Sequence, residues 1–350
     1  MENDRLIDRP SVAPSEELRW KLLGKRYISE NGVFLRVLCT LVVFLELVLV
    51  KKLRDRVTPF QILVVRAFVT AILLSLHNNK AFRDANASSI LGKKESRKLL
   101  FATAMLSFFD NACSWLAITR MPIGDATSVL YATPAVTSTV ALILGMESWS
   151  WTTPVGVVLS ILGVVLVARP PMLFHGAGAI WTSDRLVGMG FALLGMLCAS
   201  GVNLLRKVSG LEKVTVILMW QNIIVALPFS LLFLGVGFPE RPSFAFTGLD
   251  VFITVLVALG GFYSWMLVFV ALRFSSATVV AVLGTLILVW SYIGDVVIFG
   301  DAVSVPSLLG AFCIVLASVA VSFAPGAKKS EASDILPEVE FQSLQHHDDL

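Results

Sequence analysis

Ten continuous apolar runs, each about as long as a membrane-crossing helix, dominate this sequence. They fall at residues 32–50, 58–76, 99–119, 124–146, 152–169, 186–206, 214–236, 248–272, 276–298 and 304–324. A spanning helix needs about 20 apolar residues, because the hydrocarbon core of a bilayer is about 30 Å thick. The apolar residues do not alternate along the runs, which favours helices over the strands of a membrane barrel. With 15% charged residues, the chain also lies far below the roughly 25% of soluble domains. The sequence therefore predicts an all-α polytopic membrane protein with ten transmembrane helices, and it excludes a soluble enzyme.

The lysine and arginine residues between the runs predict the orientation in the membrane. With the N-terminus in the cytosol, the inner segments hold 18 basic residues and the outer segments hold 8. Cytosolic loops carry an excess of Lys and Arg, so both termini are expected in the cytosol. The sequon Asn86-Ala87-Ser88 then lies in a cytosolic loop and should remain unglycosylated. The sequence does not choose between the plasma membrane and an endomembrane.

The runs divide the chain into four parts. Residues 1–31 form a basic cytosolic arm, residues 32–171 and 186–324 hold five predicted spans each, and residues 325–350 form an acidic cytosolic tail. The arm either rests on anionic lipid of the inner leaflet or extends into solvent, and both readings stay open. The net charge is only +3 and no basic block indicates nucleic-acid binding. The expected partners are the lipid bilayer and a small-molecule solute, and a homodimer is a further expectation.

Three landmarks recur in the same order in the two halves. The first half has Cys113-Ser114-Trp115, Asp125-Ala126-Thr127 and Gly145-Met146-Glu147, and the second has Tyr263-Ser264-Trp265, Ser276-Ala277-Thr278 and Phe299-Gly300-Asp301. A half with five spans is odd-numbered, so the two halves must cross the membrane in opposite orientations. Such inverted repeats are typical of secondary transporters, whose substrate site lies near the bilayer midplane where the repeats meet.

The motifs of the first half also resemble a known family. The stretch Leu116–Thr127, the segment Tyr131-Ala-Thr-Pro134 and the run Leu162–Pro171 are similar to the EamA repeat of the drug/metabolite transporter superfamily. The Arg169-Pro-Pro171 ending and Val289-Trp290-Ser-Tyr292 resemble the G-type branch of solute carrier family 35. The second half departs from the pattern, since Asp301 replaces the usual Glu and Thr285 stands where the first half has Pro134. The resemblance implies two inverted five-helix EamA repeats, alternating access around a central cavity, and Pro134, Glu147 and Asp301 as repeat landmarks.

Four ionisable residues attract attention inside the predicted spans: Glu46, Arg66, Asp110 and Asp295. Such a group costs about 2.5–3.5 kcal/mol or more at a helix centre, so it faces a partner or a wet cavity. Arg66, with Asp110 and Asn111, is a candidate substrate site, because its planar guanidinium suits a carboxylate or phosphate. The alternative makes Arg66 a structural partner of Asp110 or Glu46. These two carboxyl groups are also candidates for proton coupling, with the same ion pair as the alternative.

Aromatic residues on the spans expected to line the cavity are further candidates for substrate contact. They provide flat apolar walls with polar edges, although packing is the alternative for each of them. The candidates are Tyr131, Tyr263, Trp265 and Trp290.

No catalytic, ATP-binding or metal-ligand motif accompanies these residues, so we expect no enzyme, no cofactor and no metal. The four cysteines lie singly in apolar runs, without a CxxC spacing.

The predicted function is secondary transport of a small polar metabolite, with an anionic metabolite as the narrower expectation. Two alternatives remain. One is a nucleotide-sugar antiporter of the endomembranes, although its long ligands call for more basic residues in the spans than Arg66 alone. The other is a non-transporting membrane scaffold that acts through its cytosolic tails.

Overall fold

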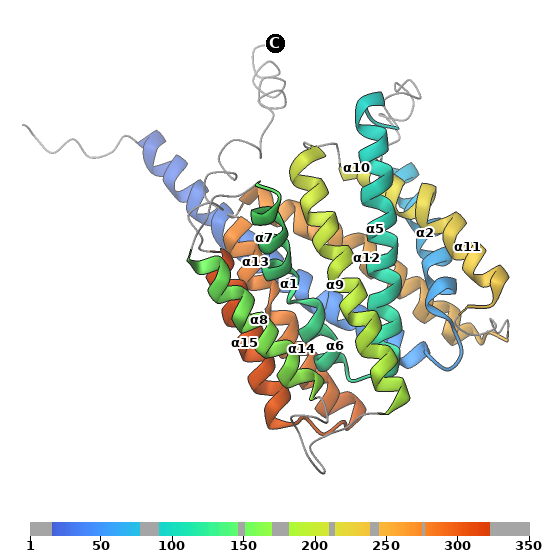
Figure 1. Ribbon diagram of the computed structural model, residues 1–350. Coiled ribbons are helices and arrows are strands. Elements are labelled where there is room, and N and C mark those ends of the chain that lie inside the picture. Colours follow the sequence, from blue (N-terminus) through green and yellow to red (C-terminus); the bar gives the residue numbers. More distant parts are fainter. Residues whose placement is uncertain are drawn as a thin grey trace, which may run out of the picture.

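The computed structural model describes residues 16–77, 91–145, 151–169, 182–209, 214–238, 245–274 and 277–322, and all regular elements in these ranges are helical. Figure 1 shows them as a bundle of long helices. The first half contributes α1 (Glu16–Leu53), α2 (Pro59–His77), the short η1 (Lys94–Ser96), α5 (Arg97–Arg120), α6 (Ile123–Leu130), α7 (Thr133–Ile143) and α8 (Thr152–Ala168). The second half contributes α9 (Ser183–Ser209), α10 (Val214–Leu218), η3 (Met219–Ala226), α11 (Leu227–Val236), α12 (Gly248–Phe274), α13 (Ala277–Gly284), α14 (Leu286–Gly294), η4 (Asp295–Phe299) and α15 (Val305–Ser322).

Eight helical segments of the described chain are long and apolar enough to cross a membrane. They are Gly32–Leu53, Pro59–Leu76, Lys94–Arg120, Ile123–Ile143, Ser183–Leu205, Thr215–Val236, Gly248–Val268 and Val282–Phe299. Two shorter apolar helices, Thr153–Ala168 and Val305–Ala320, lie where the fifth and tenth spans are predicted. Large apolar side chains such as Ile72, Val158 and Phe312 are exposed on the outside of the bundle, which suits contact with lipid. The all-helical, multi-pass membrane architecture is confirmed, whereas the count of ten spans stays a prediction.

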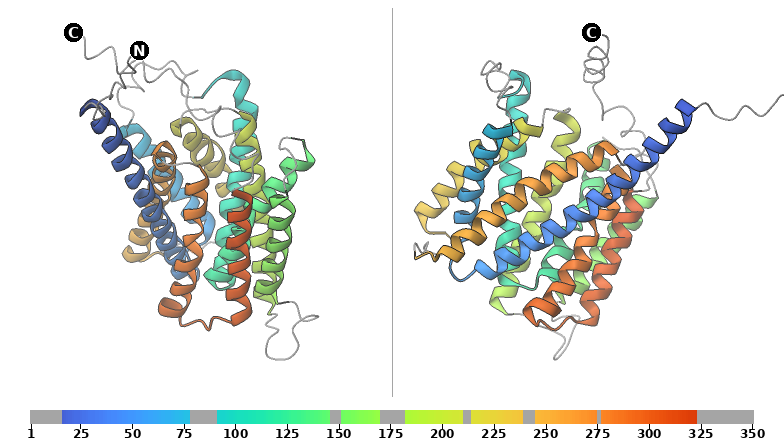
Figure 2. Two further views of the ribbon diagram at one scale, coloured as in Figure 1. Left: turned by 90° about the vertical axis from the view of Figure 1, so that its left-hand side faces the viewer. Right: turned by 180° about the vertical axis from the view of Figure 1, so that it is seen from behind.

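Helices of the two halves pack against each other in a regular pattern. Helix α5 packs along α9, and α1 packs along α12. Figure 2 shows α1 and α12 running beside each other in its right-hand view. Helix α8 packs along α15 at one edge of the bundle, α6 along α14, and α2 along η3 and α11 (Figure 1). The core of the molecule is therefore built from contacts between the halves.

The fourth and ninth predicted spans are both interrupted near their middle. The first break lies at Tyr131 and Ala132, between α6 and α7, and the second lies at Thr285, between α13 and α14. Pro134, in the first turn of α7, contributes to the first break because proline has no N–H to continue the helix. The second break forms without a proline.

A threonine stabilises each of these breaks. The Thr133 hydroxyl donates to the Leu130 carbonyl at 2.5 Å, and the Thr285 hydroxyl donates to the Val282 carbonyl at 2.7 Å. The Leu130 carbonyl has no N–H partner four residues further on, because residue 134 is proline, whereas the Val282 carbonyl also accepts the Thr285 backbone N–H at 3.1 Å. Both interruptions thus place a threonine hydroxyl on a carbonyl of the preceding helix, although their sequences differ.

Candidate functional site

A cavity of about 480 Å³ lies where the two halves meet. Its volume falls in the range of about 300–1,000 Å³ that is typical of small-molecule sites. Both helix breaks open onto it, since Tyr131, Thr133 and Thr285 are lining residues. Further walls come from α1, α2, α5, α9 and α12.

Most of the residues singled out from the sequence lie at this cavity. Those that line it are Glu46, Arg66, Asp110, Asn111, Tyr131, Pro134 and Trp265. They come from α1, α2, α5, α6–α7 and α12, which are far apart along the chain. Candidates from four spans of the first half and one span of the second half therefore meet at one cavity.

Three other candidates lie elsewhere, and a fourth is not among the described residues. The Tyr263 side chain is 52% exposed on α12, edge-on to Phe262 with ring centroids 5.6 Å apart. Trp290 is half-buried and packs against the apolar core. Asp301 lies beyond η4, where it pairs with Lys51 at 3.2 Å. Glu147 lies outside the described residues.

Arg66 is held by partners from three helices. Its side chain is buried, and Nη1 lies 3.4 Å from both Glu46 Oε1 and Asn111 Oδ1. Nη2 donates to the Gly261 carbonyl of α12 at 3.5 Å. The guanidinium also lies over the Trp115 ring, 5.8 Å from its centroid. The contact with Glu46 is the ion pair foreseen in the structural interpretation of Arg66.

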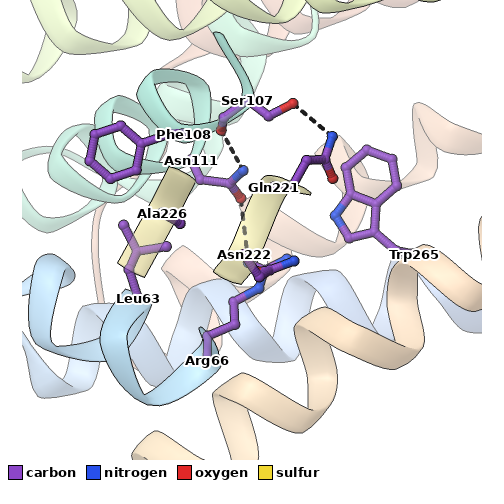
Figure 3. Close-up of a pocket in the computed structure, with 9 residues that line it drawn as sticks. All are labelled: Leu63, Arg66, Ser107, Phe108, Asn111, Gln221, Asn222, Ala226 and Trp265. Carbon is purple, nitrogen blue, oxygen red and sulfur yellow. Dashed lines mark hydrogen bonds between the residues drawn. The ribbon is translucent and has the colours of Figure 1, made fainter. Parts of the chain in front are cut away.

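A small polar pocket of about 10 Å³, enough for about one water molecule, continues the cavity beside Arg66. Figure 3 shows Gln221 and Asn222 of η3 facing Ser107 and Asn111 of α5 across it. Gln221 Nε2 donates to Ser107 Oγ at 2.9 Å, and Asn111 Nδ2 donates to the Ser107 carbonyl at 2.7 Å. A chain of hydrogen bonds therefore runs from Glu46 through Arg66 to the second half of the molecule.

Sequence reasoning missed one charged lining residue, Arg36, although it lies inside the run at 32–50. Arg36 Nε donates to the Val280 carbonyl of α13 at 2.8 Å, and Nη1 donates to Cys39 Sγ at 3.6 Å. A systematic count of charges in every run finds it. The argument that Arg66 is the single basic residue of the spans, used above against nucleotide sugars, is therefore wrong.

A second polar cluster joins the halves at the start of α6. We call it the α6 cluster; it consists of Asp125, Ser128, Tyr292 and Asp295 with the cations Lys51, Arg169 and Arg185. Buried Asp295 accepts the backbone N–H groups of Ile123 and Gly124 at 2.9 and 2.7 Å. Negative charge at a helix N-terminus is favourable, because the N–H groups there have no partner within the helix.

Asp125 is the second acid of the α6 cluster and binds two arginines. Arg185 Nη2 donates to Asp125 Oδ2 at 2.7 Å, and Arg169 Nη2 lies 3.5 Å from the same oxygen. The Tyr292 hydroxyl of α14 lies 3.3 Å from Asp125 Oδ1 and 3.1 Å from Ser128 Oγ. The cluster thus ties α6 to the end of α8, to the first turn of α9 and to α14. Thr127 and Leu130 of the same short helix, and Tyr131 directly after it, line the cavity.

Residues 30–169 match the EamA-like transporter family. This part of the chain therefore resembles an EamA-like domain. The chain is 27% identical over 237 residues to solute carrier family 35 member G1 of Homo sapiens, and 25% identical over 235 residues to the same protein of Mus musculus. Both matches cover 66% of this chain, and they cover 64% and 63% of the relatives, which is less than two thirds of their length.

A solved crystal structure shares the fold of this chain. It superposes with a TM-score of 0.54 at 18% identity, covering 84% of this chain and 96% of that one. The sequence matches confirm the resemblance to EamA-type members of solute carrier family 35.

Proposed function

We propose that this protein is a secondary membrane transporter that moves a small polar metabolite with an anionic group. It works by alternating access between two inverted EamA repeats, residues 32–171 and 186–324. The observation that carries the proposal is the pair of broken helices, one from each half, that open onto one cavity. Secondary transporters build their midplane sites from such helices, because an interrupted backbone offers polar groups that a continuous helix keeps occupied.

The helix packing supports an inverted arrangement of the two halves. Exchanging the halves converts the α5–α9 pair into the α12–α1 pair and returns the pairs α8–α15 and α2–α11 to themselves. This is the behaviour expected of two five-span repeats related by a pseudo-twofold axis. Helix α1 begins and α15 ends toward the same side of the bundle (Figure 2, left), which agrees with an even number of spans and both termini in the cytosol.

The α6 cluster supplies the closed side of the proposed cycle. In the proposed orientation Lys51, Arg169 and Arg185 lie at the outer membrane surface, and we propose that the cluster closes the cavity on that side. Outward opening then requires the ion pairs of Asp125 and the helix contact of Asp295 to separate.

Uptake into proteoliposomes tests the proposal. The purified full-length chain is offered a metabolite extract, and accumulated compounds are identified by mass spectrometry against protein-free vesicles. Accumulation of small organic acids is the expected result. Accumulation of nucleotide sugars alone would instead favour the antiporter. If nothing accumulates while the protein is folded, and cell phenotypes depend on the two tails, the scaffold replaces the transporter.

Proton coupling is the second part of the proposal and concerns Asp110 and Glu46. Asp110 lines the cavity and accepts the Ser114 hydroxyl at 3.3 Å, while Glu46 pairs with Arg66. Uptake by the wild type should depend on pH, and Asp110→Asn should remove that dependence. The idea fails if uptake is independent of pH in the wild type and in Asp110→Asn alike.

A further inference from the structure

We propose that Arg36 binds the anionic group, a carboxylate or a phosphate, of the transported solute. The inference rests on the proposed transport function and assigns the recognition step to one side chain of the cavity. Two arginines line the cavity, Arg36 and Arg66, and their surroundings differ.

Arg66 is already neutralised. Glu46 lies 3.4 Å away, and Asn111 and Gly261 occupy further donors of the guanidinium. A ligand anion would have to replace Glu46, leaving a buried carboxylate without its partner at a large cost. Arg66 therefore holds α1, α2, α5 and α12 together instead of recognising the solute.

Arg36 has no carboxylate partner among the residues that the structure describes. Its hydrogen bonds use Nε and Nη1 and go to a neutral carbonyl and a neutral thiol, those of Val280 and Cys39. Its positive charge is thus left for a ligand. An arginine with a planar fork of donors is well suited to a carboxylate or phosphate oxygen.

The backbone of the second half fixes the direction of Arg36. A Cβ atom at Gly284 would overlap Nη2 of Arg36, so the absence of a side chain there gives the guanidinium its place. Gly284 is the last residue of α13 and directly precedes the break at Thr285. The cation therefore lies at a helix C-terminus, where positive charge is favoured, beside the interrupted backbone of the cavity.

The other walls indicate the body of the solute. Asn203, Ser264 and Thr133 offer neutral polar groups, whereas Tyr131 and Trp265 offer aromatic surfaces. One unpaired cation matches one anionic group on a small body that is partly polar and partly apolar. A diphosphate would need a second cation, and Arg66 is bound to Glu46.

An anionic lipid headgroup has the same chemistry and is the competing ligand. Arg36 lies about one turn from the start of the span Gly32–Leu53, and its neighbours Phe34 and Leu38 are exposed on the lipid-facing side. The Arg36 side chain, however, contacts α13 and the cavity. We therefore assign the site to the solute, and the experiment separates the two sources.

The experiment measures uptake of three pairs of compounds into phosphatidylcholine proteoliposomes, with and without phosphatidylglycerol. The pairs are gluconate and glucose, glycerol 3-phosphate and glycerol, and 4-hydroxybenzoate and 4-hydroxybenzamide. The variants are Arg36→Gln, Arg36→Lys and the control Arg54→Gln, which removes a half-exposed cation outside the cavity.

The wild type should take up at least one anion faster than its neutral partner. Arg36→Gln should lower that rate by about 30-fold, as expected for losing one partner of a desolvated charge pair. Arg36→Lys should lower it less, and Arg54→Gln should leave it unchanged.

A second variant covers the case in which Arg36→Gln does not fold. Gly284→Ala displaces Nη2 of Arg36 and should raise the KM for the anion with little change in kcat. The proposal is overturned if Arg36→Gln keeps anion uptake, if the wild type takes up only neutral compounds, or if Arg36 matters only in vesicles with phosphatidylglycerol. Uptake of none of the six compounds, by folded wild type, contradicts the transport function itself and the role of Arg36 with it.

Discussion

At the scale of single residues, the clearest constraint is the room that Gly261 leaves for Arg66. A Cβ atom at Gly261 would lie 2.7 Å from Cζ of Arg66, whereas a Cβ at the neighbouring Gly260 would meet only Val42 Cγ1 at 3.8 Å. We predict that Gly261→Ala lowers the stability of the purified protein by about 1–3 kcal/mol, the usual cost of overpacking. Thermal unfolding followed by tryptophan fluorescence measures it. Gly260→Ala is the matched control, and equal shifts for the two variants would contradict the placement of Arg66.

The Arg66–Glu46 ion pair gives a second prediction. Removing one member leaves the other charge buried, so Arg66→Gln should destabilise the protein by about 3–5 kcal/mol and lower its abundance in membranes. The double variant Arg66→Gln with Glu46→Gln should recover much of that loss, because neither charge then remains alone. A double-mutant cycle on the unfolding temperatures checks this. Strictly additive losses would show that the two side chains do not form the pair.

The candidate site could be predicted from the sequence only in part, for a physical reason. A charge inside an apolar run is visible without a structure, and Glu46, Arg66 and Asp110 were found in that way. The direction of an aromatic side chain cannot be seen in the sequence, because a membrane helix is apolar on its lipid face and on much of its packed face. Tyr263 and Trp265 are two residues apart, yet Tyr263 is exposed and Trp265 lines the cavity.

At the scale of elements, the short helix α6 depends on the carboxylate of Asp295. That carboxylate accepts two N–H groups at the start of α6 and lies 3.6 Å from Lys51 Nζ. Asp295→Ala should therefore cost about 3 kcal/mol or more, as for a broken buried ion pair. Asp301→Ala is the control, since Asp301 contacts the same lysine but its side chain is 41% exposed, and a cost under about 1 kcal/mol is expected. Unfolding temperatures in detergent decide, and a larger effect for Asp301 would refute this account of α6.

The two helix breaks show what sequence can reveal about such elements. Pro134 predicts an irregularity in the fourth span, because proline cannot donate the hydrogen bond that a helix interior requires. No proline marks the second break, where α13 ends at Gly284 beside Arg36 and both α13 and α14 pack against α1. Only the internal repeat pointed to that position, by setting Thr285 against Pro134.

At the scale of the whole molecule, the membrane-crossing helices followed from hydropathy, but the pairing of helices did not. Hydropathy measures transfer into lipid and carries no information on which helices touch. The two apolar helices at the fifth and tenth predicted spans, Thr153–Ala168 and Val305–Ala320, are shorter than the eight candidate spans and pack along each other at one edge. A short helix can cross a bilayer where the bilayer is locally thinned, or where flanking side chains extend to the interface. The length of these two helices is therefore compatible with spanning the membrane.

The proposed topology makes a prediction for the entire chain. If both termini are cytosolic, Asn86 faces the cytosol and stays unglycosylated, whereas a sequon inserted with a flexible Gly-Ser linker between Gly176 and Ala177 reaches the lumen and is modified. Expression with microsomes, followed by glycosidase treatment and gel shift, distinguishes the two sites.

The distribution of basic residues favours this orientation, because the predicted inner segments hold 18 of them and the predicted outer segments hold 8. Four of the outer residues, Lys51, Lys52, Arg54 and Arg56, lie in one outer loop and oppose it. In the structure Lys51 pairs with Asp295 and Asp301, and Arg56 pairs with Asp250. Their charges are therefore partly neutralised within the fold, and the remaining bias favours the cytosolic termini. Glycan on Asn86 would reverse the orientation and with it the side from which the cavity is reached.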